Sequence, residues 1–463
     1  MVRLTFYGGV DEIGGNKVLL EDGNTRIWLD FGMSFSRYGR FFEEYMGPRT
    51  KTGLRDYLAL GLVPDVDGLY APDLLQMADR SPQDPAYDAV LISHPHDDHV
   101  KFVSFLHPDI PVHMSKTCLR VRERLEEIGI GTVDNRICSY RPRNPDTGKP
   151  KGATIHRPIQ AFEPGESFTV GNVEVLPMAV DHSIPGAVGF IVRTSAGSIV
   201  YSGDLRFHGR HRQWTEAFLD QAALENPVAL ITEGTRVDDT SMASENEEGV
   251  QATITEEARA TDGLVVVDYA FKDADRFQTL LQVAEETGRQ LVVGTKPAAL
   301  YDAYSEIPSV GTPPMSDPRI GIHTKQKTSP YKWEQPYYDA PNALTAEQIG
   351  AHPERYLLGL NQWALNELID IAPENALYVR SLSEPFNEEM ALDEERVDHW
   401  IDFYGMRKIR AHCSGHAPGD DLLRFVHGVG AETVFPIHTE HPEAFADVPG
   451  NVVRVEAGVP YEL

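Results

Sequence analysis

Residues 94–99 of this chain read His94-Pro95-His96-Asp97-Asp98-His99. The stretch places four potential metal ligands, His94, His96, Asp98 and His99, close together. Imidazole and carboxylate groups together suit zinc and neighbouring divalent ions. The segment before it, Tyr87–Ser93, has the pattern of a short apolar strand, so the ligands begin where a strand ends. The stretch therefore predicts a metal site at the edge of a sheet, which is a usual place for ligand sites in α/β proteins.

Composition bounds the class of protein. The chain has 463 residues, of which 41% are hydrophobic and 24% charged, which is typical of a globular protein with two domains. The formal net charge of −28 argues against a protein that coats nucleic acid. It does not argue against a nuclease, because salt screens distant charges and substrate binding depends on the charges close to the active site. Cys118, Cys138 and Cys413 form no CxxC pair and are expected to be reduced thiols. With no signal-peptide pattern and no bilayer-spanning run, we expect a cytoplasmic protein without a membrane partner.

The order of apolar segments predicts an α/β fold. Short strands separated by turn residues are predicted at Arg3–Tyr7, Lys17–Leu20, Arg26–Leu29, Val90–Ser93, Val173–Pro177, Gly189–Thr194 and Ser198–Ser202. A helix is predicted at Leu119–Ile128, and a strand–helix–strand unit at Gly263–Asp268, Asp273–Thr287 and Gln290–Gly294. That unit requires a parallel sheet with crossover helices. Further strands are predicted at Pro373–Arg380 and Arg407–Ala411, and a loop or lid at Ile307–Pro341. The stretch Phe31–Ser81 is long and irregular, which indicates a functional connection or a subdomain.

Three more polar side chains follow predicted strands. His182 comes directly after the strand region 173–180, and Asp204 follows Ser198–Tyr201. His438 follows an apolar strand that ends in Phe435-Pro436-Ile437. A single histidine or aspartate at a strand end is more often structural than a ligand. The joint pattern is a stronger indication, because strand ends at one edge of a sheet bring such side chains together.

The motifs resemble the metallo-β-lactamase fold. Those that carry the resemblance are Gly8-Gly9-Val10-Asp11-Glu12-Ile13-Gly14-Gly15-Asn16, the cluster at 94–99, His182-Ser183-Ile184-Pro185 and Ser202-Gly203-Asp204. They are similar, more narrowly, to the β-CASP nuclease branch and to ribonuclease J, over nearly the whole chain. The resemblance implies an αββα sandwich with an inserted β-CASP domain built on a parallel sheet. The expected parts are residues 1–234, 235–404 and 405–463, the last returning to the first domain.

The resemblance also implies a set of site residues. Glu233, His416 and His438 match the three later β-CASP motifs. Two zinc ions, with manganese or magnesium as alternatives, are implied. The ligands of one would be His94, His96 and His182; those of the other would be Asp98, His99 and His438, with Asp204 bridging. The segment His412-Cys413-Ser414-Gly415-His416 is implied to hold substrate phosphate, and the Ser183 hydroxyl could add to it.

Phosphodiester hydrolysis explains why these residue types are needed. Two metal ions about 3.5–4 Å apart supply both a nucleophile and charge relief on the phosphorus oxygens. The leaving 3′ oxygen then needs a proton, and His416 is the candidate general acid because imidazole titrates near neutral pH. Glu233 is expected to hold and charge that imidazole. Asp98 is expected to be essential for both metal and activity, and Asp30 is expected to contact a ligand histidine. His208, His211, His441 and Asp97 lie beside these motifs and are not expected to take part.

The leading expectation is a zinc-dependent ribonuclease, acting 5′→3′ as an exonuclease with some endonuclease activity, in RNA processing or decay. The inserted domain would close over the metal site and form a channel for single-stranded RNA. Side chains expected to stack on or steer the RNA are Tyr331, Trp333, Tyr337, Tyr338, Lys325, Lys327 and Lys332. The alternatives are a small-molecule metallohydrolase of thioesterase or lactonase type, a DNA-directed β-CASP nuclease, and a non-catalytic RNA-binding paralogue. The sequence leaves the oligomeric state open, and a homodimer is one option.

The sequence departs from the ribonuclease J pattern in four places. Only Glu384-Pro385 remains of a Gly-Glu-Pro segment, and the third motif reads His438-Thr439-Glu440 instead of His-Gly-Glu. The segment 31–81 has no counterpart, and the chain ends soon after His438, as in the shorter archaeal enzymes. These differences leave the direction of hydrolysis and the substrate open.

Overall fold

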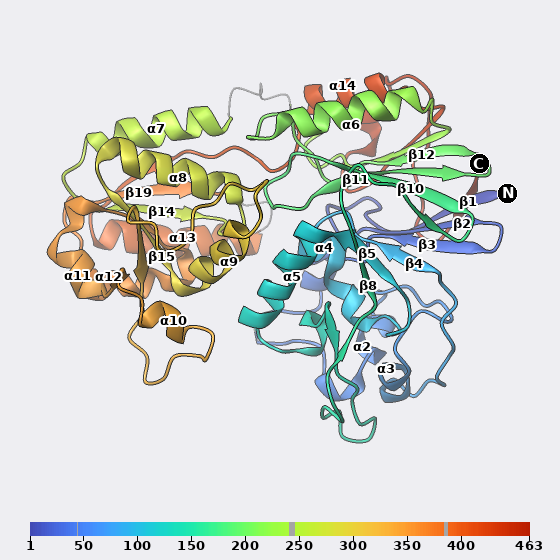
Figure 1. Cartoon of the computed structure of the whole chain (residues 1–463), viewed down its shortest axis with the longest axis horizontal. Helices are drawn as coiled ribbons and strands as arrows, with labels where there is room; N and C mark the ends of the chain where they lie inside the picture. Colours follow the sequence, from blue (N-terminus) through green and yellow to red (C-terminus); the bar gives the residue numbers. More distant parts are fainter. Residues whose placement is uncertain (44, 240–245, 384–387) are drawn as a thin grey trace. The chain divides into compact units, whose positions relative to one another are not determined.

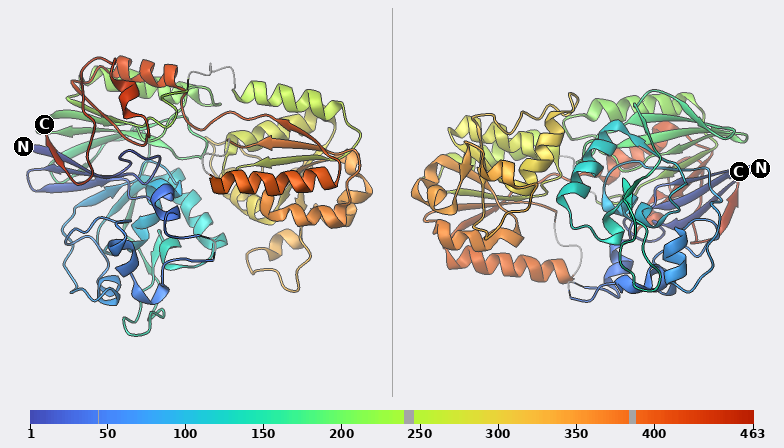
Figure 2. Two further views of the ribbon diagram at one scale, coloured as in Figure 1. Left: turned by 180° about the vertical axis from the view of Figure 1, so that it is seen from behind. Right: turned by 60° about the horizontal axis from the view of Figure 1, so that its bottom comes forward.

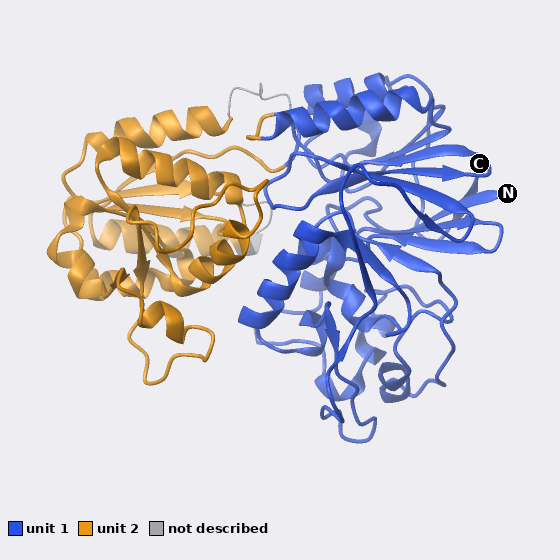
Figure 3. Ribbon diagram, in the orientation of Figure 1, with its two compact units in different colours: residues 1–207, 211–241, 416–463 blue, residues 208–210, 242–415 orange. Residues whose placement is uncertain are grey.

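The computed structural model describes residues 1–43, 45–239, 246–383 and 388–463. Figure 3 shows its two compact units. Unit 1 comprises residues 1–207, 211–241 and 416–463, and unit 2 comprises residues 208–210 and 242–415. The Glu384-Pro385 remnant lies outside the described residues. Within them, two seven-stranded sheets belong to unit 1 and one to unit 2.

The two sheets of unit 1 are mixed. The first has the order β23-β1-β2-β3-β4-β5-β8, with β1 Val2–Gly8, β2 Lys17–Asp22, β3 Thr25–Leu29, β4 Ala89–Leu91, β5 Val112–Ser115, β8 Ile159–Phe162 and β23 Pro460–Glu462. The second has the order β22-β21-β13-β12-β11-β10-β9, with β9 Phe168–Val170, β10 Val173–Ala179, β11 Val188–Thr194, β12 Gly197–Tyr201, β13 Ala229–Thr232, β21 Thr433–Pro436 and β22 Asn451–Val452. Each sheet is antiparallel on one side and parallel on the other, the change occurring at β3 and at β12. A short hairpin, β6 Ser139–Tyr140 with β7 Ile155–His156, stands apart.

Apolar side chains divide unit 1 into four layers. Its helices are α1 Phe35–Gly39, α2 Arg55–Ala59, α3 Pro72–Met77, α4 Asp97–Val100, α5 Lys116–Ile128, α6 Arg212–Leu224 and α14 Gly419–Val429. One buried cluster, which includes Phe6, Phe190 and Phe435, lies between the two sheets. A second joins the other face of the second sheet to α6 and α14, and a third joins the first sheet to α5 and the short helices. Figure 1 shows α6 and α14 on one side of this sandwich and α4 and α5 on the other, which confirms the predicted αββα arrangement.

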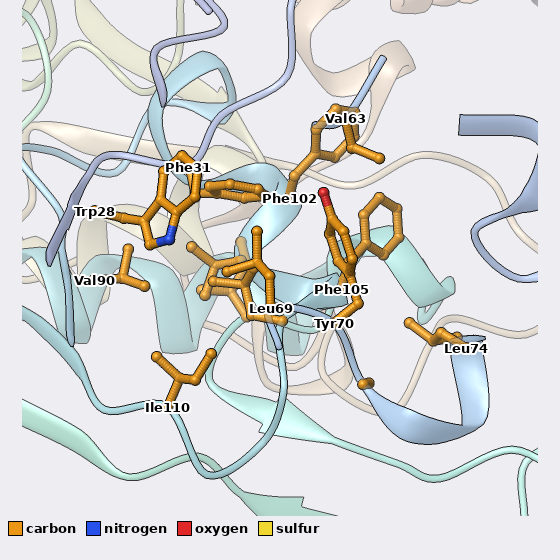
Figure 4. Close-up of a cluster of buried hydrophobic side chains, with 14 of the residues drawn as sticks. Trp28, Phe31, Val63, Leu69, Tyr70, Leu74, Val90, Phe102, Phe105 and Ile110 are labelled. Atoms are coloured by element: carbon orange, nitrogen blue, oxygen red, sulfur yellow. The ribbon is translucent and has the colours of Figure 1, made fainter. Parts of the chain in front are cut away.

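The segment 31–81 forms part of the core of unit 1. Figure 4 shows Leu69, Tyr70 and Leu74 from this segment packed with Phe102 and Phe105, and all five are at most 2% exposed. The rings of Phe102 and Phe105 are stacked with centroids 5.1 Å apart. The segment is therefore packed into the core of unit 1.

Unit 2 is built on an all-parallel sheet. Its order is β17-β16-β15-β18-β14-β19-β20, with β14 Val265–Tyr269, β15 Gln290–Gly294, β16 Ile320–His323, β17 Ala343–Leu344, β18 Tyr356–Gly359, β19 Leu377–Ser381 and β20 Arg407–Arg410. Its helices are α7 Glu247–Arg259, α8 Ala274–Thr287, α9 Thr295–Ser305, α10 Gln335–Tyr338, α11 Ala346–Ala351, α12 Leu368–Ile371 and α13 Glu388–Phe403. Apolar residues of α11, α12 and α13 cover one face of the sheet, and Figure 2 shows α13 running alongside it. The predicted strand–helix–strand unit is confirmed as β14, α8 and β15.

Two segments of unit 2 differ from the predictions. The segment 307–341 was expected to be a loop or lid, but it contains the buried strand β16, which pairs with β15. Its proline- and lysine-rich flanks hide a strand of only four residues. Strand β20 pairs with β19 inside unit 2, whereas the expected return to the first domain after residue 404 assigns this strand to the other part.

Candidate metal centre

Seven of the predicted ligands form two groups that share one residue. His94, His96, His182 and Asp204 form the first group, and Asp98, His99, Asp204 and His438 the second; within each group one donor atom per residue lies within 4.8 Å of the others. Asp204 Oδ2 lies 3.6 Å from His94 Nε2, 3.2 Å from His99 Nε2 and 3.7 Å from His438 Nε2. Asp204 is therefore the residue through which the two groups are in contact.

All seven side chains are presented from strand-end loops of unit 1. His94 to His99 follow β4 and enter α4, His182 follows β10, Asp204 follows β12 and His438 follows β21. The parallel pairing of β12 with β13 and of β13 with β21 brings the last two of these loops to one edge of the second sheet. The observed sheet order thus explains how ligands more than 300 residues apart in the chain meet.

The chemistry of the donor set fits divalent cations. His96 Nδ1 lies 3.1 Å from both His94 Nε2 and His182 Nε2, so three ring nitrogens converge. Ligands bonded to zinc at about 2.0–2.1 Å in a tetrahedron are separated by about 3.3 Å, close to these distances. Asp204 Oδ1 and His99 Nε2 are buried without a hydrogen-bond partner among the described residues. Buried polar atoms normally have partners, so these two atoms are suited to bind a cation.

Protonation of the rings points the same way. Burial and neighbouring histidines hold the pKa of His94 and of His182 well below the usual range, so both rings are neutral and carry a lone pair. Burial would also lower the pKa of His99, but the carboxylates of Asp204, Asp98 and Asp30 raise it well above the usual value. The negative charge around His99 can be balanced by a proton or by a metal cation.

Contacts behind the ligands fix which ring nitrogen faces the centre. Asp30 Oδ2 lies 2.7 Å from His99 Nδ1, the kind of contact expected for Asp30 from the sequence. Ser93 Oγ and Tyr201 Oη both donate to the same oxygen, at 2.7 and 2.6 Å. With Nδ1–H donated to Asp30, Nε2 is the ring nitrogen of His99 that faces Asp98 and Asp204.

A third group places His416 beside the shared carboxylate. Asp204, Glu233 and His416 also have donor atoms within 4.8 Å of one another. His416 Nδ1 lies 2.9 Å from Glu233 Oε2 and 3.9 Å from Asp204 Oδ2. Burial alone would lower the pKa of His416, but Glu233, Asp204 and Asp98 raise it to about 9. The side chain of His416 is 21% exposed against 1% for Glu233, so the ring can be reached from outside while its partner cannot.

Thr235 links Glu233 to the ligand His438. Its hydroxyl donates to Glu233 Oε2 at 2.6 Å and lies 2.8 Å from His438 Nδ1. Since the hydroxyl has only one proton, it accepts from His438 Nδ1–H, which leaves Nε2 of His438 facing Asp98 at 3.3 Å. His438 has a φ of +52°, a conformation rare outside glycine that is held by its backbone N–H donating to Gly9 O.

Comparison with known proteins assigns this geometry to a family. Residues 63–266 match the beta-lactamase superfamily domain, and residues 406–447 match the Zn-dependent metallo-hydrolase RNA specificity domain. The chain belongs to the metallo-β-lactamase/β-CASP family. It is therefore a metallohydrolase of a zinc-dependent family, carrying clusters of histidine and aspartate that can hold metal.

Within this family the chain has distant full-length similarity to ribonuclease J. It is 25% identical to ribonuclease J of Mycolicibacterium smegmatis, over 100% of this chain and 75% of that protein. It is 24% identical to ribonuclease J of Pyrococcus abyssi, over 95% of this chain and 90% of that protein. A crystal structure of a protein of unknown function from Enterococcus faecalis V583 shares the fold, with a TM-score of 0.76, 21% identity and full coverage of both chains.

Of the phosphate-binding segment expected at residues 412–416, residues 412–415 belong to unit 2 and His416 belongs to unit 1. In unit 2 the buried Arg276 contacts the segment: its guanidinium lies 3.4 Å from His412 Nδ1 and donates to Cys413 O. The Cys413 thiol is buried and donates to Glu247 Oε1 at 3.1 Å. Burial and Arg276 lower the pKa of His412 to about 3. Ser414 O accepts from His208 Nε2, and Ser183, in unit 1, is half-buried.

The neighbours set aside in the sequence have other contacts in this family member. Asp97 pairs with Arg122 at 2.9 Å, and His441 pairs with Glu443 at 3.1 Å. His211 stacks on Trp214 with ring centroids 4.0 Å apart. Each of the three side chains therefore has a partner that is not a predicted metal ligand.

Sequence reasoning missed a buried ion pair that braces two ligand loops. Arg206 Nε lies 3.0 Å from Asp181 Oδ1, and both side chains are completely buried. The Arg206 backbone N–H also donates to Asp181 O at 2.8 Å. Asp181 precedes His182 and Arg206 follows Asp204 by two residues, so the pair ties together the loops that carry these ligands. Adjacency to the ligands was the available signal, but the pairing depends on the sheet order.

Glycines let a second loop approach the 94–99 segment. A Cβ on Gly14, which has a φ of +76°, would meet the Asp98 side chain, and a Cβ on Gly32 would overlap the Asp98 carbonyl. The Asn16 backbone N–H donates to Asp98 O at 3.1 Å. The glycine-rich opening motif therefore packs directly against Asp98.

The aromatic residues expected to contact RNA are of two kinds. Tyr337 is buried and its hydroxyl donates to Asp302, and the Tyr338 hydroxyl donates to Lys325 O, so packing explains both. Tyr331 is 67% exposed and stacks on Trp333 at a centroid distance of 6.3 Å. Among the described residues, no helix combines the length and apolar composition that a membrane crossing requires.

Proposed function

We propose that this chain is a zinc-dependent ribonuclease that hydrolyses RNA phosphodiester bonds, acting 5′→3′ as an exonuclease with some endonuclease activity. The observation that carries the proposal is the His416–Glu233 pair beside Asp204, the residue shared by both ligand groups. A proton donor at a two-metal centre suits release of an alkoxide leaving group. RNA is the proposed substrate because residues 406–447 match an RNA specificity domain and the full-length relatives are named ribonuclease J.

Two divalent ions fit the ligand groups. His94, His96 and His182 would hold one ion, Asp98, His99 and His438 the other, and Asp204 both. When bound, such ions polarise phosphoryl oxygens and make water acidic enough to serve as a nucleophile near neutral pH. Asp98 and Asp204 bring only two negative charges against four positive ones. The loaded centre therefore attracts phosphate even though the chain carries a net charge of −28.

His416 would supply the proton to the leaving group. Its Nδ1–H is directed at Glu233, so the opposite nitrogen, Nε2, is left to face the substrate. As the bond from phosphorus to the 3′ oxygen breaks, the Nε2 proton passes to that oxygen, giving a 3′-hydroxyl and a 5′-phosphate. Glu233 holds the ring in place and stabilises its charged form, while Leu205 N–H and Thr235 fix the Glu233 carboxylate.

Labelled oligonucleotides test the proposal. RNA with a 5′-monophosphate, 5′-triphosphate or 5′-hydroxyl end, and a DNA of the same sequence, would be incubated with the zinc-loaded protein. Mononucleotides released progressively from the 5′-monophosphate substrate are the expected result. Fixed internal fragments would show an endonuclease instead of an exonuclease. Cleavage of the DNA alone would show that the substrate is DNA and not RNA. No cleavage of either polymer would contradict the proposal and favour a small-molecule hydrolase or a binding protein.

Three variants assign any activity to this centre. Asp98→Ala is expected to lose both cleavage and bound zinc, measured by elemental analysis. His416→Ala is expected to lose cleavage but keep its zinc. The matched control is His441→Ala, an exposed histidine three residues beyond a ligand, which is expected to retain both. An Asp98→Ala protein with its full zinc content would contradict the ligand assignment.

A further inference from the structure

Unit 1 contains a polar cavity formed by segments that contribute no ligand to the metal centre. Its volume is about 110 Å³. The residues that line it come from α3, from the short helix at 101–105 and from the loop before and after β6: Asp73, Leu74, Ser104, Gly131, Val133, Arg136, Tyr140, Arg141, Arg143 and Pro150. Leu74, at the border of the hydrophobic cluster in Figure 4, closes its apolar side. Three arginines and one carboxylate around one cavity give it a positive charge within an acidic chain.

Arg136 and Arg143 each use only one terminal nitrogen of the guanidinium group in the contacts to neighbouring residues. Arg136 contacts Ser139 Oγ at 3.3 Å and Glu126 at 3.9 Å through one terminal nitrogen. Arg143 donates from one terminal nitrogen to Gly148 O at 2.9 Å. Each guanidinium has five N–H groups in a planar fork. The other terminal nitrogens of both residues therefore remain for a ligand in the cavity.

The acidic groups nearby are occupied by other donors. Asp73 accepts from the Tyr140 hydroxyl and from the Arg143 backbone N–H. Glu126 accepts from the backbone N–H groups of residues 137 and 138 and from the Ser139 hydroxyl. The hydrogen bonds of both carboxylates therefore come from neutral groups, and the ion pair between Glu126 and Arg136, an arginine that lines the cavity, is long at 3.9 Å.

The two half-buried arginines also repel each other. Burial lowers the pKa of Arg143 and the neighbouring charge of Arg136 lowers it further, whereas Asp73, Tyr140 and Asp134 raise it. An anion between the two guanidinium groups would remove this repulsion. Arginine forks match the paired oxygens of phosphate, which makes a phosphate group the anion of best fit.

From this geometry we infer that the cavity is a binding site for a phosphate group, separate from the metal centre. Pockets that bury a whole drug-sized ligand measure about 300–1,000 Å³, so this one takes the anionic group and not the nucleoside attached to it. The phosphate can be free, the end of a nucleotide, or an internal phosphate of an RNA chain. The site does not depend on the function proposed above.

Titration calorimetry with inorganic phosphate tests the inference on the full chain. The double variant Arg136→Gln/Arg143→Gln is expected to bind phosphate at least about tenfold more weakly at this site than the wild type. The matched control is Arg40→Gln, an exposed arginine of the same unit, which should leave binding unchanged. Asp98→Ala disturbs the metal centre and should also leave this binding event in place. Because the loaded metal centre also attracts phosphate, the double variant is measured in the Asp98→Ala background. Phosphate binding that survives the double variant there, or that disappears in Asp98→Ala alone, would overturn the inference.

Two further measurements sharpen the test. Arg136→Lys/Arg143→Lys keeps both charges but not the forks, and a partial loss of affinity is expected even if the glutamine variant unfolds. In the Asp98→Ala background, uridine 5′-monophosphate and a dinucleoside monophosphate replace inorganic phosphate as probes. Arginine-dependent binding of the first identifies a terminal phosphate, and that of the second an internal one. Binding of all three probes that is independent of both arginines would refute the site.

Discussion

Removing the charge of Asp181 tests whether the buried ion pair holds the metal centre together. Asp181→Asn keeps the shape of the side chain and an oxygen for Arg206, but it removes the negative charge that lies 3.0 Å from the guanidinium. Breaking a fully buried pair by removing one partner costs about 3–5 kcal/mol. At about 2–4 °C per kcal/mol for a large domain, the melting temperature should fall by roughly 6–20 °C.

The assay combines thermal unfolding with metal affinity. Unfolding would be followed by circular dichroism, and zinc affinity by competition with a chelator. Because the pair braces the loops of His182 and Asp204, zinc should bind about 10–100-fold more weakly. Asp238→Asn, an exposed acid of the same unit, is the control and should change neither quantity. An Asp181→Asn protein that melts and binds zinc like the wild type would refute the bracing role.

Three more predictions concern other parts of the chain. His416→Ala should slow single-turnover RNA cleavage by about 10²–10⁴-fold at unchanged zinc content, and an unchanged rate would remove it from the proton-donor role. Gly32→Ala should abolish zinc binding, measured by elemental analysis, because its Cβ would overlap the Asp98 carbonyl. Burial raises the pKa of Asp268 to about 6 against the Tyr378 hydroxyl, so its neutral form favours the native state and stability falls as pH rises from about 4 through 6. In denaturant titrations, Asp268→Asn should reduce this pH-dependent fall in the free energy of unfolding by up to about 3 kcal/mol. A variant whose free energy of unfolding depends on pH as in the wild type would contradict this prediction.

Much of the fold follows from local patterns. The predicted strand at 290–294 and helix at 273–287 match β15 and α8 almost residue for residue, because apolar runs bounded by turn residues are local signals. The pairing of β13 with β21, in contrast, joins residues about 200 positions apart in the chain. No local pattern specifies which distant strand becomes a neighbour, so the position of His438 in the sheet rested on resemblance alone.

The hydrogen bonds that other residues make to the ligand histidines could be predicted from the sequence only in part. Asp30 could be expected because it ends a strand near the ligand loops. Thr235 could not, since a hydroxyl beside a strand usually caps a turn, and its contact with His438 depends on how two strands are packed. Strand β16 was missed for a related reason, because four buried residues between proline- and lysine-rich flanks carry too short a pattern.

The pairing of β13 with β21 has a consequence for how the protein is made. Glu233 directly follows β13, and His438 lies 205 positions further along the chain. At about 5–20 residues per second, a ribosome needs roughly 10–40 s to cover that distance. Throughout this interval the nascent second sheet has an open edge at β13 and the metal centre lacks one ligand. Unit 2 leaves the ribosome within the same interval, so the metal centre of unit 1 can be completed only after the whole of unit 2 has been synthesised.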